Sequence, residues 1–155
     1  MSARPSASVR HILTGASAGA AAAAVWAAAE PHVARALGHT YTDVRLLGRV
    51  AGGERTWVPA GVVVHLGNGA GFGAALALTG PLTFRRAVGW VAVETVVTWP
   101  LMALADKAHP DRRSGRWPRL LTSKPIMAHE AIMHAIFGLV MGAILAFARR
   151  RRCRA

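Results

Sequence analysis

Four long apolar segments, separated by shorter polar ones, dominate the pattern of hydrophobic and polar positions along the chain. They are residues 9–29, 58–78, 87–105 and 126–148. A helix needs about 20 mainly apolar residues, each rising about 1.5 Å, to cross the hydrocarbon core of a bilayer. The pattern therefore predicts an all-α fold, a four-transmembrane-helix bundle that forms a single integral membrane domain over residues 1–155.

The first segment is the least certain of the four to remain in the protein, because it is built of Ala and Gly rather than Leu and Ile. Arg4 and Arg10 at its start would also suit a cleaved signal peptide. Its apolar part is long, however, and Glu30 and Pro31 follow it directly. We therefore expect it to be retained as a span.

The connecting segments carry turn and breaker signals. Residues 30–57 have the mixed pattern of a short interfacial helix, followed by the breaker AGGER at 51–55. The sequence TGPLTFRR predicts a tight turn between the second and third segments, and three prolines keep residues 106–124 from being helical throughout. We expect the histidines of these polar connections to be solvated; they are His32, His39 and His109.

The net charge is +12 although 53% of the residues are hydrophobic, so charged and apolar residues must be segregated. Basic residues that flank apolar segments are typical of membrane anchors, and no nucleic-acid-binding motif accompanies them, which argues against a nucleic-acid partner. We expect the basic cytoplasmic tail at 149–155 to contact anionic lipid, which favours a bacterial inner (plasma) membrane with both termini inside. Cys153 is the single cysteine, so an intrachain disulfide and a cysteine-based zinc site are excluded.

The pattern His-x3-Gly-x3-Gly-Ala-x-Leu occurs in both the second and the fourth segment. Positions i, i+4 and i+8 share one face of a helix, and glycines on that face allow another helix backbone to approach closely. The repeat predicts helix packing at Gly69, Gly73, Gly138 and Gly142. Two helical hairpins related by an axis along the membrane normal are one interpretation. A shorter match at His11 is interpreted as coincidence.

The same faces carry polar residues that are costly in a membrane. An acidic side chain near the centre of a membrane helix costs about 2.5 to 3.5 kcal/mol unless it is protonated or has a partner, so Glu94 should have one. We expect one layer inside the bundle, with further polar residues beside it. The expected cluster is His65, Glu94, Glu130, His134, Asn68, Thr98 and Glu30.

This cluster admits three functions. Intramembrane His and Glu can handle, move or sense protons or ions. Two imidazoles with carboxylates would also suit Zn or Fe, with His65, His134, Glu94 and Glu130 as the metal ligands of a membrane enzyme. The third function is a structural or accessory subunit, with a homo-oligomer or a membrane partner. The spacing of His129, Glu130 and His134 matches neither the zincin motif nor the di-iron motif, so an enzyme is the less favoured interpretation.

The stretches TWPLMAL and HEAIMHAIFG resemble the YagU-type family of small bacterial inner-membrane proteins. The likeness lies in Pro-Leu-Met after an apolar helix and in a Glu followed four residues later by a His. It covers about half of the chain. The resemblance implies a helical inner-membrane protein with a part in acid tolerance, and it implies no catalytic residue.

Overall fold

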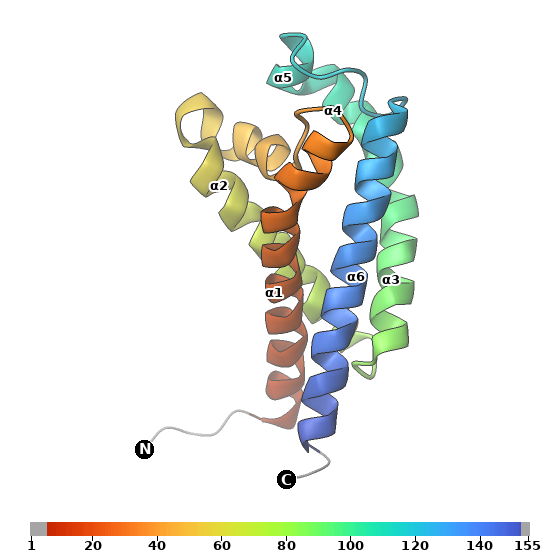
Figure 1. Cartoon of the computed structure of the whole chain (residues 1–155). Helices are drawn as coiled ribbons and strands as arrows, with labels where there is room; N and C mark the ends of the chain where they lie inside the picture. Colours follow the sequence, from red (N-terminus) through yellow and green to blue (C-terminus); the bar gives the residue numbers. More distant parts are fainter. Residues whose placement is uncertain (1–5, 153–155) are drawn as a thin grey trace.

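The described part of the chain is mainly helical. A computed structural model describes residues 6–152, and these residues contain no strand. Figure 1 shows the order of the elements. They are α1 (Ala7–Ala36), α2 (Asp43–Leu78), α3 (Phe84–Thr98), the 3-10 turn η1 (Trp99–Leu101), α4 (Met102–Ala108), α5 (Pro110–Arg113) and α6 (Lys124–Arg152). The predicted all-α four-helix architecture is confirmed.

Four helical stretches are long and apolar enough to cross a membrane. They are Ser8–Ala36, Asp43–Leu78, Phe84–Ala108 and Lys124–Arg151, and each expected span lies inside one of them. Large apolar side chains face outward on these helices, for example Val63, Val96 and Leu104. An apolar outer surface is stable against lipid and unstable against water. The protein is therefore a small multi-pass integral membrane protein.

α1 and α2 pack backbone against backbone along a seam of glycines. Gly15 lies against the carbonyl of Gly73, and Gly19 lies against the carbonyl of Gly69. A Cβ atom at Gly69 would stand only 2.6 Å from the Cβ of Ala23, so no larger residue fits there without movement. Gly15 and Gly19 belong to the pattern match at His11, which therefore has a packing role of its own.

α3 and α6 form a second pair with a different kind of contact. The ring of Phe84 covers Gly142, where an added Cβ would lie 2.7 Å from a ring carbon, and Val91 lies beside Gly138 at an ordinary contact distance of 3.4 Å. α1 also packs on α6, which joins the two pairs. This pairing agrees with two hairpins, and their common symmetry stays a prediction.

α2 is sharply bent near its start. Gly53 has φ +70°, which glycine adopts without strain, and Thr56 also leaves helical geometry, so the break falls at the predicted AGGER segment. Gly48 then packs against the carbonyl of Trp57, and Gly61 against the carbonyl of Val44. The first part of α2 is thus folded back onto the part that continues down the bundle (Figure 1). Its first residue, Asp43, donates its backbone N–H to Glu30 of α1.

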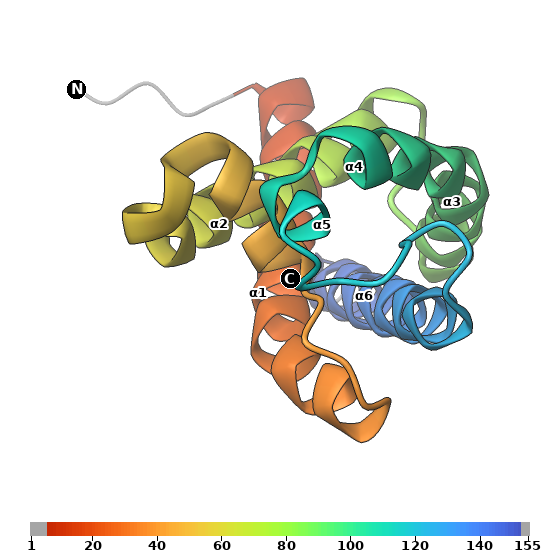
Figure 2. The ribbon, with the colours of Figure 1, turned by 90° about the horizontal axis from the view of Figure 1, so that it is seen from above.

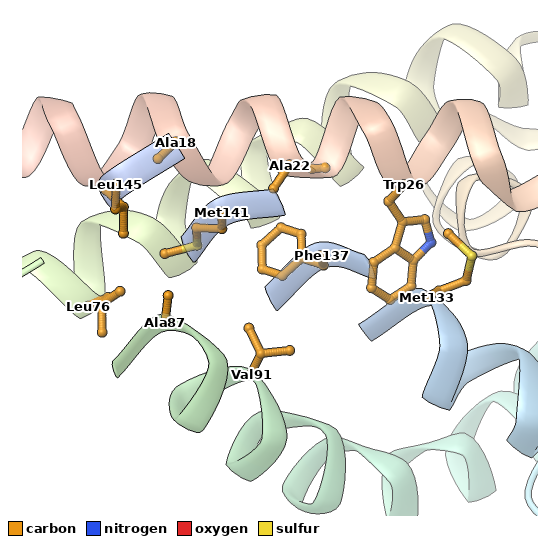
Figure 3. Close-up of a cluster of buried hydrophobic side chains, with 11 residues drawn as sticks. Ala18, Ala22, Trp26, Leu76, Ala87, Val91, Met133, Phe137, Met141 and Leu145 are labelled. Atoms are coloured by element: carbon orange, nitrogen blue, oxygen red, sulfur yellow. The ribbon is translucent and has the colours of Figure 1, made fainter. Parts of the chain in front are cut away.

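An apolar core fills the bundle between α1, α3 and α6. Figure 3 shows Trp26, Phe137 and Met141 meeting the small side chains of α1 and the aliphatic residues of α3. Alanines such as Ala18 and Ala22, both almost fully buried, keep α1 close to α6. The end of the bundle where α1 begins and α6 ends is thereby packed with apolar side chains.

The opposite end is covered by a polar cap made of α5 and its flanking segments (Figure 2). Asp111 accepts two hydrogen bonds from the Arg45 guanidinium, at 2.7 and 3.2 Å. His109 is 2% exposed, stacks on Trp117 with 4.6 Å between ring centroids, and accepts the Asp111 N–H at the start of α5. The expectation that His109 is solvated is wrong, because its ring is part of this buried cap.

Candidate functional site

A histidine of α6 and a glutamate of α3 meet inside the bundle. The Nε2 of His134 lies 3.0 Å from the Oε2 of Glu94. The other ring nitrogen, Nδ1, lies 2.8 Å from the backbone carbonyl of Glu130, one turn earlier on α6. The side chain of His134 is 13% exposed and is therefore enclosed by the protein. The side chain of Glu94 is 35% exposed and is accessible from outside the protein core.

The geometry of this pair fixes its proton count. A carbonyl oxygen only accepts hydrogen bonds, so Nδ1 of His134 must carry a hydrogen and donate it to Glu130. The contact between Nε2 and Glu94 then needs one further proton, carried either by the imidazole or by the carboxyl group. Without that proton, a ring lone pair would face a carboxylate. The pair therefore holds together only while it shares one proton.

Trp26 of α1 packs against this pair and against the second expected histidine. Its ring makes edge-on contacts with His134 and His65, with centroids 4.7 and 5.3 Å apart. The Nε2 of His65 is buried without a hydrogen-bond partner among the described residues. Both histidines thus contact the same indole ring of Trp26. Nε2 of His65, however, makes no hydrogen bond to His134 or Glu94.

Glu130 and two smaller polar residues complete the predicted set. Glu130 is 3% exposed, and its Oε2 lies 3.6 Å from Nδ1 of His134. Its Oε1 is buried without a hydrogen-bond partner in the described chain. Thr98 donates its hydroxyl hydrogen to the carbonyl of Glu94 at 2.9 Å, and Asn68 is exposed on α2.

Glu30 has a different role from the other acids of the expected cluster. It is 1% exposed, and its carboxylate accepts the N–H groups of Asp43 and Val44 at 2.5 and 3.4 Å and the indole N–H of Trp26 at 3.3 Å. The N–H groups at the start of a helix lack partners within the helix and favour negative charge nearby. Glu30 therefore caps the N-terminus of α2 and fixes α2 to α1.

Asp43 and Tyr41 belong to the same region and were not predicted from the sequence. The Tyr41 hydroxyl donates to Asp43 at 2.5 Å. Burial raises the pKa of the Tyr41 phenol well above its ordinary value, and the charge of Asp43 raises it further, so Tyr41 remains a donor. Thr42, which accepts the Arg45 N–H as the N-cap of α2, is the sequence signal that places Asp43 in a first helical turn.

A cavity of about 760 Å³ connects these groups. It lies between α2 on one side and α3 and α4 on the other, with Trp26 and residues of α6 at its inner wall. Its polar lining consists of Asp43, His65, Asn68, Glu94, Thr95, Thr98, Glu130 and His134. Glu30 is not among the lining residues. The cavity therefore reaches the Glu94 pair and leaves the Glu30 cap sealed.

The predicted metal site has no ligand set in this arrangement. Within residues 6–152, no group of three or more His, Cys, Asp or Glu side chains is placed to hold a metal ion. His65 is separated from the Glu94 pair in the way described above, and Nδ1 of His134 is already occupied by a carbonyl. The geometry thus favours proton exchange within a pair over metal coordination.

Comparison with known proteins adds no identification to this geometry. No protein-family profile, curated protein or solved structure matches the chain. The likeness to the YagU-type family stays a prediction. The function must therefore be argued from the site itself.

Proposed function

We propose that this small membrane protein senses protons through the Glu94–His134 pair. The observation that carries the proposal is the 3.0 Å contact between two titratable side chains on different helices, at the wall of a cavity. Gain or loss of the shared proton changes the attraction between α3 and α6 at this point. The pair is thus a protonation site coupled to helix packing.

The rest of the bundle supports sensing at one side rather than passage of protons across the membrane. Beyond the polar layer, α2 continues from His65 to Leu78 over about 20 Å at 1.5 Å per residue. The fully buried residues described over that distance are apolar, among them Leu76, Met141 and Leu145. A proton relay needs polar groups or water at each step, and these buried residues supply none.

Several other titratable groups surround the pair and would contribute to its response. Glu30 faces the region from α1, Asp43 and His65 from α2, and His129 and Glu130 from α6. His129 is fully buried and lies 3.6 Å from Glu30. The response belongs to this whole group, and Glu94 is its member most open to the cavity.

We further propose that the protein lies in the bacterial inner membrane with its N-terminus and its C-terminus on the inner side. α1 begins and α6 ends at the same end of the bundle, as four spans require (Figure 1). Arg149, Arg150 and Arg151 at that end would contact anionic headgroups. This orientation directs the cavity and the polar cap to the outer side, where a YagU-type part in acid tolerance would need a proton sensor. A homo-oligomer or a membrane partner stays a prediction.

A cysteine introduced at the cavity wall tests the sensing function. In a Cys153→Ser background, Asn68→Cys places a thiol on α2 beside the cavity. We expect its rate of reaction with an uncharged maleimide to change with pH beyond the change in a free thiol, because the α3–α6 contact opens or closes the space. The same thiol in an added Glu94→Gln variant should lose that extra change.

The control for this experiment is Gly89→Cys, which lies on the exposed face of α3 with open space around it. The rate at which this thiol reacts with the maleimide should follow its ionisation alone, both with Glu94 and with Gln at position 94. The sensing function is wrong if Asn68→Cys responds to pH equally with Glu94 and with Gln at that position.

A further inference from the structure

We propose that the cavity between α2 and α3 binds a lipophilic organic cation, a molecule with an aromatic or aliphatic body and one positive charge. The inference names a ligand class for the same site, and it rests on the proposed proton sensing. It is carried by the charge of the cavity, the chemistry of its walls and the open space beside α2.

The cavity is acidic. Asp43, Glu94 and Glu130 line it, whereas the described lining contains no lysine or arginine. His134 and Glu94 share one proton and together carry no net charge. Asp43 accepts a hydrogen bond from Tyr41, and Glu130 lies 3.6 Å from Nδ1 of His134, so no lysine or arginine of the described lining offsets these two acids. A positive ligand complements such a site, and a negative one is repelled.

One acid presents an oxygen that the protein leaves without a hydrogen-bond partner. Glu130 is 3% exposed, and its Oε1 has no hydrogen-bond partner in the described chain. Buried polar atoms in native proteins nearly always have a partner, so Glu130 is an uncommon case. The Nε2 of His65, a second residue that lines the cavity, is likewise buried without a hydrogen-bond partner in the described chain. The cavity wall thus contains two polar residues whose hydrogen-bonding capacity the described chain does not use in full.

The remaining walls suit an apolar body. Four aromatic side chains line the cavity, namely Trp26, Phe72, Trp99 and Phe137. Aromatic faces attract organic cations and bury their apolar surface at the same time. The volume of about 760 Å³ falls within the range of about 300 to 1,000 Å³ that is usual for pockets of drug-sized ligands.

α2 keeps this space open with two glycines that have no role in helix packing. Gly67 and Gly71 line the cavity, and a Cβ atom added at either would meet nothing within 4 Å. By contrast, Gly69, which also borders the cavity, and Gly73 are pressed against α1. The chain thus uses one pair of glycines for packing and leaves the other beside empty space.

Cation binding and proton binding oppose each other at such a site. Both add positive charge to the same acids, so a bound cation favours release of a proton, and a bound proton weakens binding of the cation. We expect cation affinity to fall as the pH falls, by up to about tenfold per pH unit where one proton is exchanged.

The test uses the full chain in detergent micelles and two probes of equal size and opposite charge. Equilibrium dialysis measures binding of tetraphenylphosphonium, and tetraphenylborate serves as the matched anion. We expect saturable binding of the cation at pH 8, at least tenfold tighter than that of the anion, and weaker cation binding at pH 5. Equal binding of both probes would overturn the inference, because it would reflect apolar partitioning alone.

Two pairs of variants locate the binding. Gly71→Leu fills the cavity and should abolish saturable cation binding, while Gly89→Leu, an open position on α3 outside the cavity, should leave it unchanged. Glu130→Gln should weaken cation binding at least tenfold, while Glu54→Gln, which changes an exposed acid on α2 that does not line the cavity, should not. Binding that survives both Gly71→Leu and Glu130→Gln contradicts the inference.

These outcomes separate the ligand from the sensor. If both probes bind equally while the maleimide rate of Asn68→Cys still depends on pH through Glu94, the ligand class is wrong and the sensing function stands. If the cation binds selectively but independently of pH and of Glu94, the cavity is a cation site and the sensing function is wrong.

Discussion

Glu30 and Glu94 are both acids inside apolar helices, and their surroundings are opposite. Glu30 is 1% exposed and accepts hydrogen bonds from Asp43, Val44 and Trp26. The side chain of Glu94 is 35% exposed, pairs with His134, and lines the cavity. An acid in a membrane helix is therefore structural where its oxygens are saturated by the fold, and available for chemistry where one partner and open space remain.

The scaffold that holds both acids can be broken at the glycine seam, and we expect this to have the largest effect. Gly73→Leu would force a side chain into the backbone of α1 at Gly15 and should cost about 3 kcal/mol or more of unfolding free energy. A Cβ atom added at Gly71 meets nothing within 4 Å, so the matched variant Gly71→Leu should change the unfolding free energy by about 0.5 kcal/mol at most. Denaturation in mixed micelles measures both, and equal losses would contradict the assigned seam.

The sealed acid comes next. Glu30→Ala leaves the N–H groups of Asp43 and Val44 and the indole N–H of Trp26 without their acceptor, so we expect a loss of about 2 to 3 kcal/mol. Glu30→Gln keeps one accepting oxygen and should lose about 1 kcal/mol. The same denaturation experiment checks the order. A tolerated alanine would show that Glu30 does not cap α2.

The polar cap should loosen in acid. Burial lowers the pKa of His109, so the unfolded state binds a proton near pH 6.5 that the folded cap binds less readily. Burial alone would raise the pKa of Asp111, but the Arg45 hydrogen bond and the nearby arginine charges lower it below its ordinary value. The cap is thus most stable above about pH 6.5, loses stability below it as His109 charges, and loses more as the pH falls through the lowered pKa of Asp111.

Amide hydrogen exchange of residues 111–114, corrected for the intrinsic pH dependence of exchange, measures this opening. We expect lower protection at pH 5.5 than at pH 7.5. In a His109→Asn variant the difference should shrink. Protection that rises in acid would contradict the assigned direction.

The smallest effect on stability should come from the available acid. Glu94→Ala removes one partly exposed ion pair, and such pairs contribute less than about 1 kcal/mol. The variant should therefore fold almost as well as the parent in the micelle denaturation experiment and still lose the pH response of the cavity. A loss as large as that of Glu30→Ala would place Glu94 in the same structural class.

The sequence was sufficient for features that depend on local pattern. Helix length and hydropathy located four spans, and the i, i+4 stripe together with depth put Glu94 and His134 in one layer. It was insufficient for Asp43, because its approach to Glu30 depends on the backfolding of α2 at Gly53. The buried setting of His109 was missed for the same reason, since a polar loop composition does not show that the loop packs on Trp117.

The proposed sensing requires that His134 and Glu94 share one proton while Nδ1 of His134 stays protonated. Nitrogen-15 NMR of histidine-labelled protein in nanodiscs measures both protonation states directly, with the His134 signals assigned by their loss in His134→Gln. We expect Nδ1 to remain protonated throughout, and Glu94→Gln to move the titration midpoint of Nε2 by about one pH unit or more, while Glu54→Gln does not. A midpoint that is the same with Glu94 and with Gln would show that the two residues share no proton.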